Sequence, residues 1–241
     1  MRRDEYVRIA QVEASHWWYA ATRALLTQVL TPHLAAGARL LDAGCGTGAT
    51  GGWLARHGRL AASDVEPLAL ALYREARPTA ALAAAEIERL PFADGSFDLA
   101  LCVTVLYHAR VADPAAAVRE LARTVRPGGV VCLLEPGVPR LRRAHDRITH
   151  TARRFAASDM RALLTGAGLN PLRVTGAYGF LVPPALVKAL VERGDTASDL
   201  DTGRGLAGAL LGRLARLERR WLARHDLPIG LSVLGLGVKQ S

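Results

Sequence analysis

The sequence has little that could cross-link the chain or hold a metal. Its 241 residues include only three cysteines, set far apart in apolar or glycine-rich runs: Cys45, Cys102 and Cys132. Neither a Cys-x-x-Cys nor a His-x-x-x-His pair occurs. This usage predicts reduced, mostly buried thiols in a cytoplasmic protein, with no disulfide framework and no metal site.

Long hydrophobic runs are also missing. The longest segment without Asp, Glu, Lys or Arg is Ala24–Ala38, which has 15 residues and contains Pro32, whereas a membrane span needs about 20 apolar residues. The first residues, MRRDEYVRIAQ, lack the apolar region of a secretory signal. Apolar residues still make up 50% of the chain and charged residues 22%. This balance excludes disorder as the main state and predicts one domain, residues 1–241, with a full core.

Lysine is nearly absent, and the positive charge is unevenly placed. Two lysines stand against 29 arginines. Residues 1–137 carry 14 Arg and 14 Asp plus Glu, so they are neutral, whereas residues 138–241 carry 17 basic and 8 acidic residues and hold the whole excess of +9. We therefore expect the two halves to have different roles.

Short apolar runs alternate with helical stretches through the middle of the chain, which is typical of a parallel sheet with crossover helices. Strands are predicted at 38–44, 59–64, 79–86, 96–106 and 129–136, and further strands near 172–175 and 230–238. One helix is predicted at 114–125, with Asp113 as its N-cap and Pro114 in its first turn. Another is predicted at 158–168, opening with Ser158.

Residues 178–229 are too long for a structureless connection, so we predict that they hold helices. Residues 204–224 show one plainly, because leucines and a tryptophan recur at helical spacing on one face while arginines crowd the rest. The apolar positions are Leu206, Leu210, Leu214, Leu217 and Trp221, and the basic ones are Arg213, Arg216, Arg219, Arg220 and Arg224.

The segment LLDAGCGTG, residues 40–48, carries the strongest chemical signal. A strand ends in Asp42 and is followed by Gly44, Gly46 and Gly48, which would let the backbone approach a ligand closely. The spacing also satisfies the dinucleotide fingerprint, with Asp64 where a ribose-binding acid is expected. Asp42 decides between the two, because a carboxylate there would repel a pyrophosphate but attract the cationic amino end of S-adenosylmethionine.

This motif is the first of five elements that occur in order over residues 38–136. The others are Asp64 after the second strand, Glu86-Ile87 after the third, the segment LPFADGSFDLALCVTVLYH, and the turn Val-Arg-Pro-Gly-Gly at 125–129. Together they resemble the class I S-adenosylmethionine-dependent methyltransferases. The resemblance implies a Rossmann-like α/β fold, with a seven-stranded mostly parallel sheet and helices on both faces.

The resemblance also assigns parts to the chain. It implies a helical lead-in or lid (1–37), a cofactor-binding core (38–177), a helical substrate cap (178–229) and a last strand (230–241). S-adenosylmethionine would be the cofactor. Its methionine part would lie on Gly44, Cys45, Gly46 and Gly48 with Asp42 near the amino group, its ribose on Asp64 and Val65, its adenine between Glu86 and Ile87, and its sulfonium before Thr104 and Val105.

A second resemblance lies outside the core. Glu13-x-x-His16-Trp17-Trp18-Tyr19-x-x-x-Arg23 is similar to the "E-x-x-H-W-W-F" lead-in of a bacterial methyltransferase subgroup, many of whose members work in glycan or natural-product pathways. Two adjacent tryptophans on a helix would form a lid over the pocket, or simply dock the helix on the sheet. Arg23 is a candidate for the methionine carboxylate, with a solvated helix face as the alternative.

His108, just past the long fourth strand, is the first candidate for a general base, because its unperturbed pKa lies near neutrality. The alternative is a residue that only lines the pocket. The residues expected on the acceptor side are His16, Trp17, Tyr19, Tyr107, His150 and Tyr178.

The predicted reaction is methyl transfer to an oxygen, less favourably a nitrogen, of a small-molecule acceptor that the basic half would suit if it is anionic. One alternative acceptor is a sugar on a lipid-linked carrier at a membrane surface, and another alternative is a non-catalytic cofactor-binding partner protein. The arginine-rich helix fits contact with an acidic membrane as well as plain solvation. No nucleic-acid-binding motif occurs, so no nucleic acid is expected. The sequence fixes neither the acceptor nor the oligomeric state.

Overall fold

The computed structural model describes residues 3–141, 146–147, 149–191 and 205–240. Its strands are β1 (Ala38–Ala43), β2 (Gly58–Asp64), β3 (Ala81–Ala84), β4 (Phe97–Val103), β5 (Val125–Pro136), β6 (Leu169–Ala177) and β7 (Ser232–Lys239). Its α-helices are α1 (Arg3–Val12), α2 (Trp17–Leu30), α3 (Pro67–Ala76), α4 (Pro114–Thr124), α6 (Ala157–Gly166), α7 (Val182–Val191) and α8 (Gly205–Leu222). Short 3-10 turns are η1 (Thr31–His33), η2 (Gly52–Arg56) and η3 (Gly179–Leu181).

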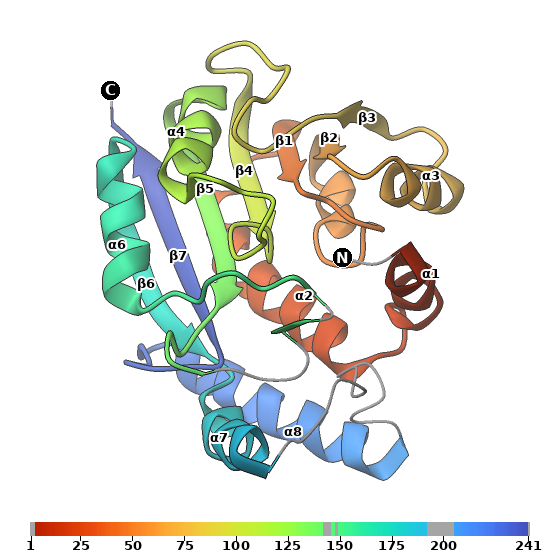
Figure 1. Ribbon diagram of the computed structural model, residues 1–241. Helices are drawn as coiled ribbons and strands as arrows, with labels where there is room; N and C mark the ends of the chain where they lie inside the picture. The colour runs from red at the N-terminus through yellow and green to blue at the C-terminus, as the bar shows by residue number, and fades with distance from the viewer. Residues whose placement is uncertain (1–2, 142–145, 148, 192–204, 241) are drawn as a thin grey trace.

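The seven described strands form one sheet with the order β3-β2-β1-β4-β5-β7-β6 (Figure 1). β7 pairs antiparallel with β5 and β6, and the pairs among β1 to β5 are parallel. This is the Rossmann-like, mostly parallel sheet that was predicted. In such a sheet the carboxyl ends of the parallel strands share one edge, and that edge positions the site.

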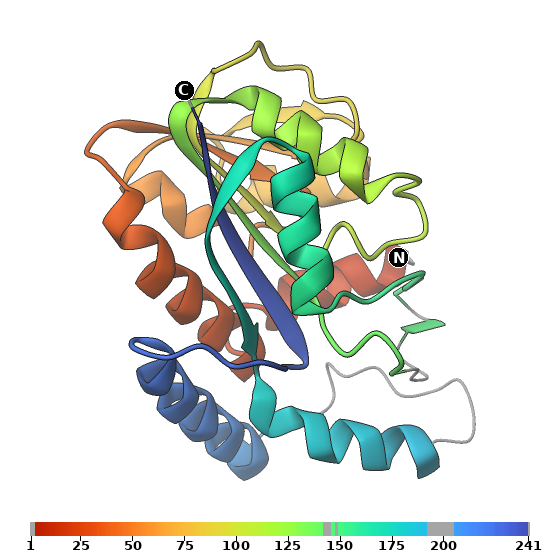
Figure 2. The ribbon, with the colours of Figure 1, turned by 90° about the vertical axis from the view of Figure 1, so that its left-hand side faces the viewer.

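Helices cover both faces of the sheet, so its central strands are buried on both sides and consist almost wholly of apolar residues. One face packs against α4 and α6 through Leu121, Met160 and Leu164. The other packs against α2 and α8 through Leu26 and Leu222, among others. Figure 2 shows α4 and α6 on one side of the sheet and α2 on the other. The three cysteines are free and buried, as predicted.

Several predicted boundaries were wrong for local reasons. β4 ends at Val103 rather than 106, because Thr104 takes a left-handed conformation with φ 53°. β5 begins at Val125 instead of 129, and β6 spans 169–177 instead of 172–175. α4 begins as predicted, with the Asp113 carboxylate accepting from the Ala115 N–H. α6 begins at Ala157, where Asp159 rather than Ser158 satisfies the backbone, by accepting from the Ala156 N–H at 2.8 Å.

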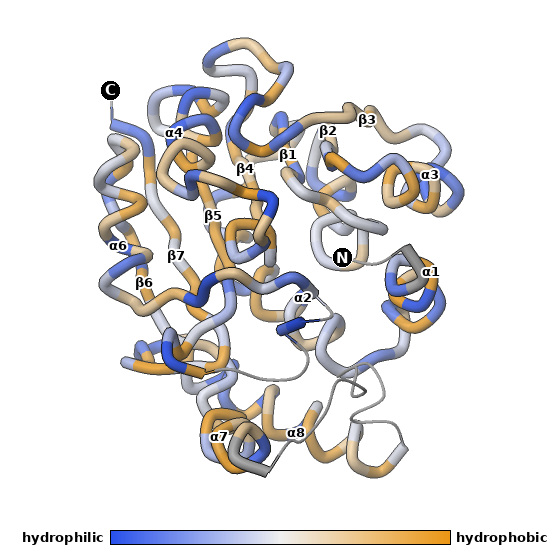
Figure 3. The backbone as a smooth tube through the Cα atoms, viewed as in Figure 1, coloured by the Kyte–Doolittle hydropathy of each residue, from blue (hydrophilic) through white to orange (hydrophobic). Residues whose placement is uncertain are grey.

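Between β6 and β7 the chain forms η3, α7 and α8, and α8 coincides with the predicted helix over 204–224. Its leucine and tryptophan face does not pack on the core, however, because residues on the opposite side of the helix make that contact: Gly208, Ala215 and Leu222. Figure 3 shows hydrophobic residues on both α7 and α8, which lie outside the sheet. Among the described helices, none is long and apolar enough to cross a membrane.

Candidate functional site

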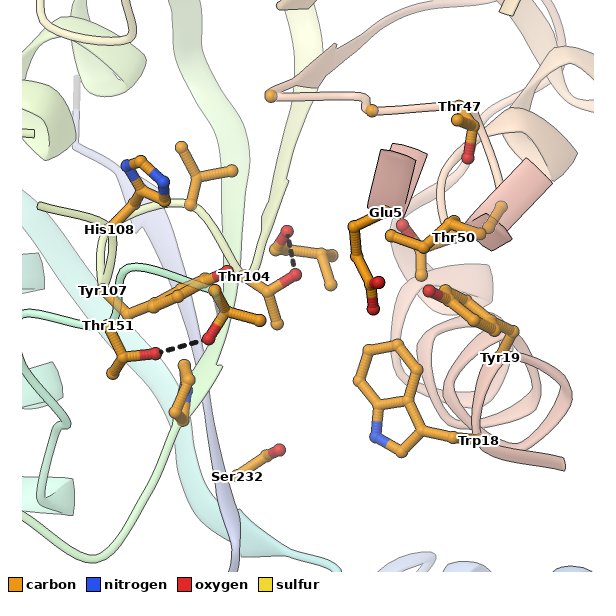
Figure 4. Close-up of a pocket in the computed structure, with 18 of the residues that line it drawn as sticks. Glu5, Trp18, Tyr19, Thr47, Thr50, Thr104, Tyr107, His108, Thr151 and Ser232 are labelled. Carbon is orange, nitrogen blue, oxygen red and sulfur yellow. Dashed lines mark hydrogen bonds between the residues drawn. The ribbon is translucent and has the colours of Figure 1, made fainter. Parts of the chain in front are cut away.

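A cavity of about 550 Å³ lies at the carboxyl ends of the parallel strands, a volume typical of small-molecule sites. The loops after β1, β2, β3 and β4 form one wall, and α1, α2, α7, α8, the end of β5, the segment before α6 and the start of β7 also contribute. In Figure 4, Glu5 from α1 and Trp18 and Tyr19 from α2 face Thr104 and Tyr107 across the cavity. Residues far apart in sequence therefore meet at one chamber.

The glycine-rich loop after β1 is tied to the end of β2 by its own backbone. The Gly44 and Cys45 N–H groups both donate to the Ser63 carbonyl, at 2.7 and 2.9 Å. The Gly46 N–H donates to the Asp64 carboxylate at 2.8 Å. Because these donors are already satisfied, the loop presents its surface to the cavity in a fixed shape.

The three glycines of this loop do not share one role. Gly46 lines the cavity, and a Cβ added to it would meet nothing within 4 Å. A Cβ on Gly44 would lie 2.2 Å from a Val105 methyl carbon, so Gly44 makes room for a side chain of the protein. Gly48 does not line the cavity and packs on Tyr73 and Arg77. Gly44 and Gly46 therefore both line the cavity, and the space beside Gly46 is open.

Asp64 ends β2 with its carboxylate engaged by two backbone donors, Gly46 N–H at one oxygen and Glu66 N–H at the other, at 2.8 and 2.9 Å. Burial raises the pKa of Asp64 above its ordinary value, while these two N–H donors oppose the shift. Cys45, Val65, Glu86 and Ile87, which were expected around the cofactor, line the same region of the cavity as Asp64. Each carboxylate oxygen keeps a second lone pair for a further donor.

Asp42 lies beneath the loop instead of in the cavity wall. It is 2% exposed, and a Cβ on Gly51 would fall 2.1 Å from its carboxylate. Burial, reinforced by the nearby Asp64, raises the pKa of Asp42 to about 7. Its Oδ2 atom is buried without a hydrogen-bond partner among the described residues. Asp42 is therefore not in the cavity wall, where it was expected beside the amino group of the cofactor.

The aromatic lead-in reaches the cavity as expected. His16 caps α2 by accepting from the Trp18 N–H at 3.3 Å, and His16, Trp17, Trp18 and Tyr19 all line the cavity. Both tryptophans also pack against the hydrophobic cluster under α2. The two interpretations of this pair, as lid and as docking residues, are therefore compatible.

Besides Asp42 and Gly48, three predicted site residues lie outside the cavity lining. Arg23 does not line the cavity, and its guanidinium donates to the carbonyls of Ala49 and Glu13, at 2.9 and 3.3 Å. Tyr178 is buried, and its hydroxyl bonds that of Thr22 at 2.7 Å. His150 is exposed outside the lining, with its ring centroid 5.7 Å from that of His108.

The loop after β4 is held by Glu135, a fully buried residue near the end of β5. Its carboxylate accepts three consecutive N–H groups, from Val105 at 3.0 Å, Leu106 at 2.9 Å and Tyr107 at 3.2 Å. Burial nevertheless raises its pKa to about 7. Sequence analysis missed Glu135, although a lone acid in the apolar run GVVCLLEP was a signal that it binds backbone.

His108 lines the cavity, but its geometry differs from that of a base. Its Nδ1 atom accepts from the Arg110 N–H at 3.1 Å, so the neutral ring carries its proton on Nε2 and donates there. Burial is the main cause that lowers the pKa of His108 to about 4. This arrangement favours the alternative interpretation, a residue that lines the pocket.

Basic residues also line the cavity. They are Arg110 in the loop after β4, Arg154 before α6 and Lys188 on α7. The Arg154 guanidinium pairs with Asp146 at 2.5 Å, and both side chains are less than a tenth exposed. Sequence analysis missed these cations, as well as Tyr6 and Thr50, because no spacing relates them to the glycine loop.

Comparison with known proteins places this geometry in context. Residues 41–133 match the family model described as a methyltransferase domain. A malonyl-[acyl-carrier protein] O-methyltransferase from Pseudescherichia vulneris is 34% identical over 199 residues, which cover 76% of this chain and 74% of that protein. A demethylmenaquinone methyltransferase from Beutenbergia cavernae is 38% identical over 105 residues, 43% of this chain and 42% of that protein.

The fold has a solved counterpart. A chain from the complex between the Haloferax volcanii Trm112 methyltransferase activator and a methyltransferase has a TM-score of 0.65 and 21% identity, and the match covers 100% of this chain and 98% of that chain. At this identity the likeness concerns the fold alone.

The raised pKa of Glu135 predicts a specific effect on stability. A carboxyl group with a folded-state pKa of about 7 stabilises the fold most below its ordinary pKa, and this contribution is lost as the pH rises through 7. Glu135→Gln removes the titration. The difference in free energy of unfolding, wild type minus variant, should therefore fall between pH 5 and pH 8 in urea denaturation. Asp42 titrates in both proteins, so its contribution cancels in the difference between their free energies of unfolding. A difference that stays constant between pH 5 and pH 8 would show that three N–H donors keep Glu135 ionised.

Proposed function

The chain belongs to the class I S-adenosylmethionine-dependent methyltransferases, and from this premise we propose that it methylates a carboxylate oxygen of a small-molecule acceptor. The observation that carries the proposal is the division of charge within the cavity. Acidic residues of the lining follow β2 and β3, at one side of the sheet, and basic residues come from the β4 loop, from the segment before α6 and from α7, while Glu5 on α1 and Asp146 beside Arg154 add two further acids. One end suits a cation and the other an anion.

The acidic end fits S-adenosylmethionine, the cofactor of this family. Asp64 offers free lone pairs to ribose hydroxyls, and Glu86 and Ile87 offer an acceptor, a backbone N–H and an apolar wall to adenine. Gly46 leaves open space above the loop. When bound, S-adenosylmethionine supplies a methyl group on an already activated sulfonium leaving group.

The basic end fits an anionic acceptor. Arg110, Arg154 and Lys188 bring basic groups to the cavity lining, and Arg154 pairs there with Asp146. An ionised carboxylate is a nucleophile at neutral pH without losing a proton, so positioning supplies most of the catalysis. The Nε2–H of His108 would donate to the acceptor oxygen that is not attacked, and Thr104 and Val105 would face the methyl group from the end of β4.

The relatives agree with oxygen methylation in part. A protein of which this chain matches 74% is named as an O-methyltransferase of a malonyl group on acyl-carrier protein. For this chain we propose the same class of reaction, methylation of an oxygen, but not the same acceptor.

The proposal makes a distinctive prediction about the product. A methyl ester is cleaved by mild alkali and releases its methyl group as volatile methanol, whereas a methyl ether or a methylamine is not. With S-adenosylmethionine labelled in the methyl group and a panel of aliphatic carboxylic acids, each matched by its alcohol and its amine, we expect label only with the acids, and we expect alkali to release it. Alkali-stable label would contradict carboxylate methylation, and no transfer to any member of the panel would favour the non-catalytic alternative.

Asp64→Ala should weaken binding of S-adenosylhomocysteine by about 10- to 150-fold, which corresponds to the ~1.5–3 kcal/mol of a hydrogen bond to a charged group. Calorimetry measures this constant directly. The matched control is Glu75→Ala, which removes the same charge from an exposed position on α3 outside the cavity, and its affinity should stay unchanged. Equal affinities in the two variants would place the ribose away from Asp64.

His108 is tested by two substitutions with the acceptor that the panel identifies. His108→Asn keeps a donor and should retain most of the activity, whereas His108→Ala should raise KM for the acceptor and lower kcat by less than about fivefold, under ~1 kcal/mol of barrier. Since its pKa of about 4 keeps His108 neutral above pH 5, wild-type kcat should show no limb from this residue between pH 5 and 9. A loss of 10²–10⁴ in kcat for both variants would restore the role of general base.

A further inference from the structure

The outer face of α8 carries a stripe of large apolar side chains that the fold leaves in solvent. Their exposed fractions are 92% for Leu206, 58% for Leu210, 36% for Leu214, 59% for Leu217 and 55% for Trp221. These five residues, the α8 stripe, recur at intervals of three or four and so share one side of the helix. Single exposed leucines are common on protein surfaces. A continuous row of them along one helix indicates a surface that a membrane or another molecule covers.

The opposite side of α8 accounts for its attachment to the protein, so the stripe is not needed for packing. Gly208, Ala215 and Leu222 are the buried positions. Arg219 donates to the Gln28 side chain on α2 at 3.1 Å, and Gln28 donates back to the Arg219 carbonyl at 3.1 Å. The helix is thus fixed to α2 with its stripe turned outward.

The charge beside the stripe has one sign. Arg213, Arg216 and Arg220 are exposed along its edge. The one acid within the α8 sequence, Glu218, faces inward, where its carboxylate accepts N–H groups of Tyr178 and Phe180. Residues 138–241 also hold the whole net charge of +9. Whatever covers the stripe must therefore accept apolar side chains and carry negative charge.

We propose that the outer face of α8 binds the surface of an anionic lipid bilayer. The Leu side chains and Trp221 would enter the boundary between headgroups and acyl chains, and the neighbouring arginines would extend to anionic headgroups. A second copy of the chain fits less well, because a two-fold contact through the stripe would bring the arginine rows of the two copies together. The remaining candidate for this surface is an acidic protein, and the experiment below distinguishes binding to such a protein from binding to lipid.

This surface adjoins the cavity, since α8 presents Leu211 to the cavity lining and the stripe to the outside. α7, which also lines the cavity, contributes Pro184, Ala185 and Lys188. Binding at the α8 stripe would place this wall of the cavity beside the lipid. The proposal concerns attachment to the bilayer and holds whichever acceptor is methylated.

The test measures co-sedimentation of the full chain with vesicles. We expect binding to phosphatidylcholine vesicles that contain 30% phosphatidylglycerol, loss of binding at high salt, and little binding to phosphatidylcholine alone. Leu210→Ser/Leu217→Ser should reduce the partition coefficient at least tenfold. The matched control, Val7→Ser/Leu172→Ser, removes two exposed apolar side chains of α1 and β6 and should bind like the wild type. Arg213→Gln/Arg220→Gln should lower the partition coefficient about fivefold for each arginine removed.

A second readout does not depend on these variants. Trp221 fluorescence should shift to the blue on addition of the anionic vesicles and be quenched by brominated acyl chains, and Trp221→Phe should abolish both effects. Equal partition of the stripe variant and its control would overturn the proposal. So would a concentration-dependent dimer in sedimentation velocity that Leu210→Ser/Leu217→Ser converts to monomer, or binding to acidic proteins without binding to vesicles.

Discussion

Carboxylates that accept backbone N–H groups hold the two loops on which the site depends. Asp64 fixes the loop after β1 through the Gly46 N–H, and Glu135 fixes the loop after β4 through three consecutive N–H groups. Each carboxylate lies near the end of the neighbouring strand. Asp64 ends β2, next to β1, and Glu135 lies near the end of β5, next to β4. Since loops otherwise lack the regular ladders of the sheet, these bonds are what transfers the order of the sheet to the cavity wall.

This mode of support has an electrostatic consequence. Burial raises the pKa of the Asp42, Asp64 and Glu135 carboxyl groups at the carboxyl edge of the sheet. Asp42 and Asp64 end β1 and β2, toward the acidic end of the cavity, whereas Glu135 on β5 holds the β4 loop. The basic side chains arrive from other parts of the chain, on the β4 loop, before α6 and on α7. A division of charge along one chamber thus follows from which elements build each end.

The sequence predicted the sheet and most of the cofactor end because these depend on local patterns. Apolar runs, turn glycines and the acid at the end of β2 lie within a few residues of one another, and the strand order then brings them together. The lead-in at His16, Trp17 and Tyr19 also reached the cavity. Arg23 and Tyr178 do not line the cavity, because their polar atoms bond groups that are distant in sequence. Arg23 donates to the Ala49 carbonyl, and the Tyr178 hydroxyl bonds that of Thr22. The cations at the basic end had no such local signal, and the α8 stripe followed helical spacing without revealing which side would be buried.

Gly44 and Val105 show that a residue of a ligand-binding motif can be constrained by its own protein. A methyl group of Val105 occupies the space that a side chain at position 44 would need. A Cβ atom added to Gly44 would lie 2.2 Å from that methyl carbon. Positions 44 and 105 are therefore a complementary pair across two neighbouring strands. In a lineage of related chains, an alanine at 44 would require a smaller residue at 105, and the two positions should vary together even where the bound molecule stays the same.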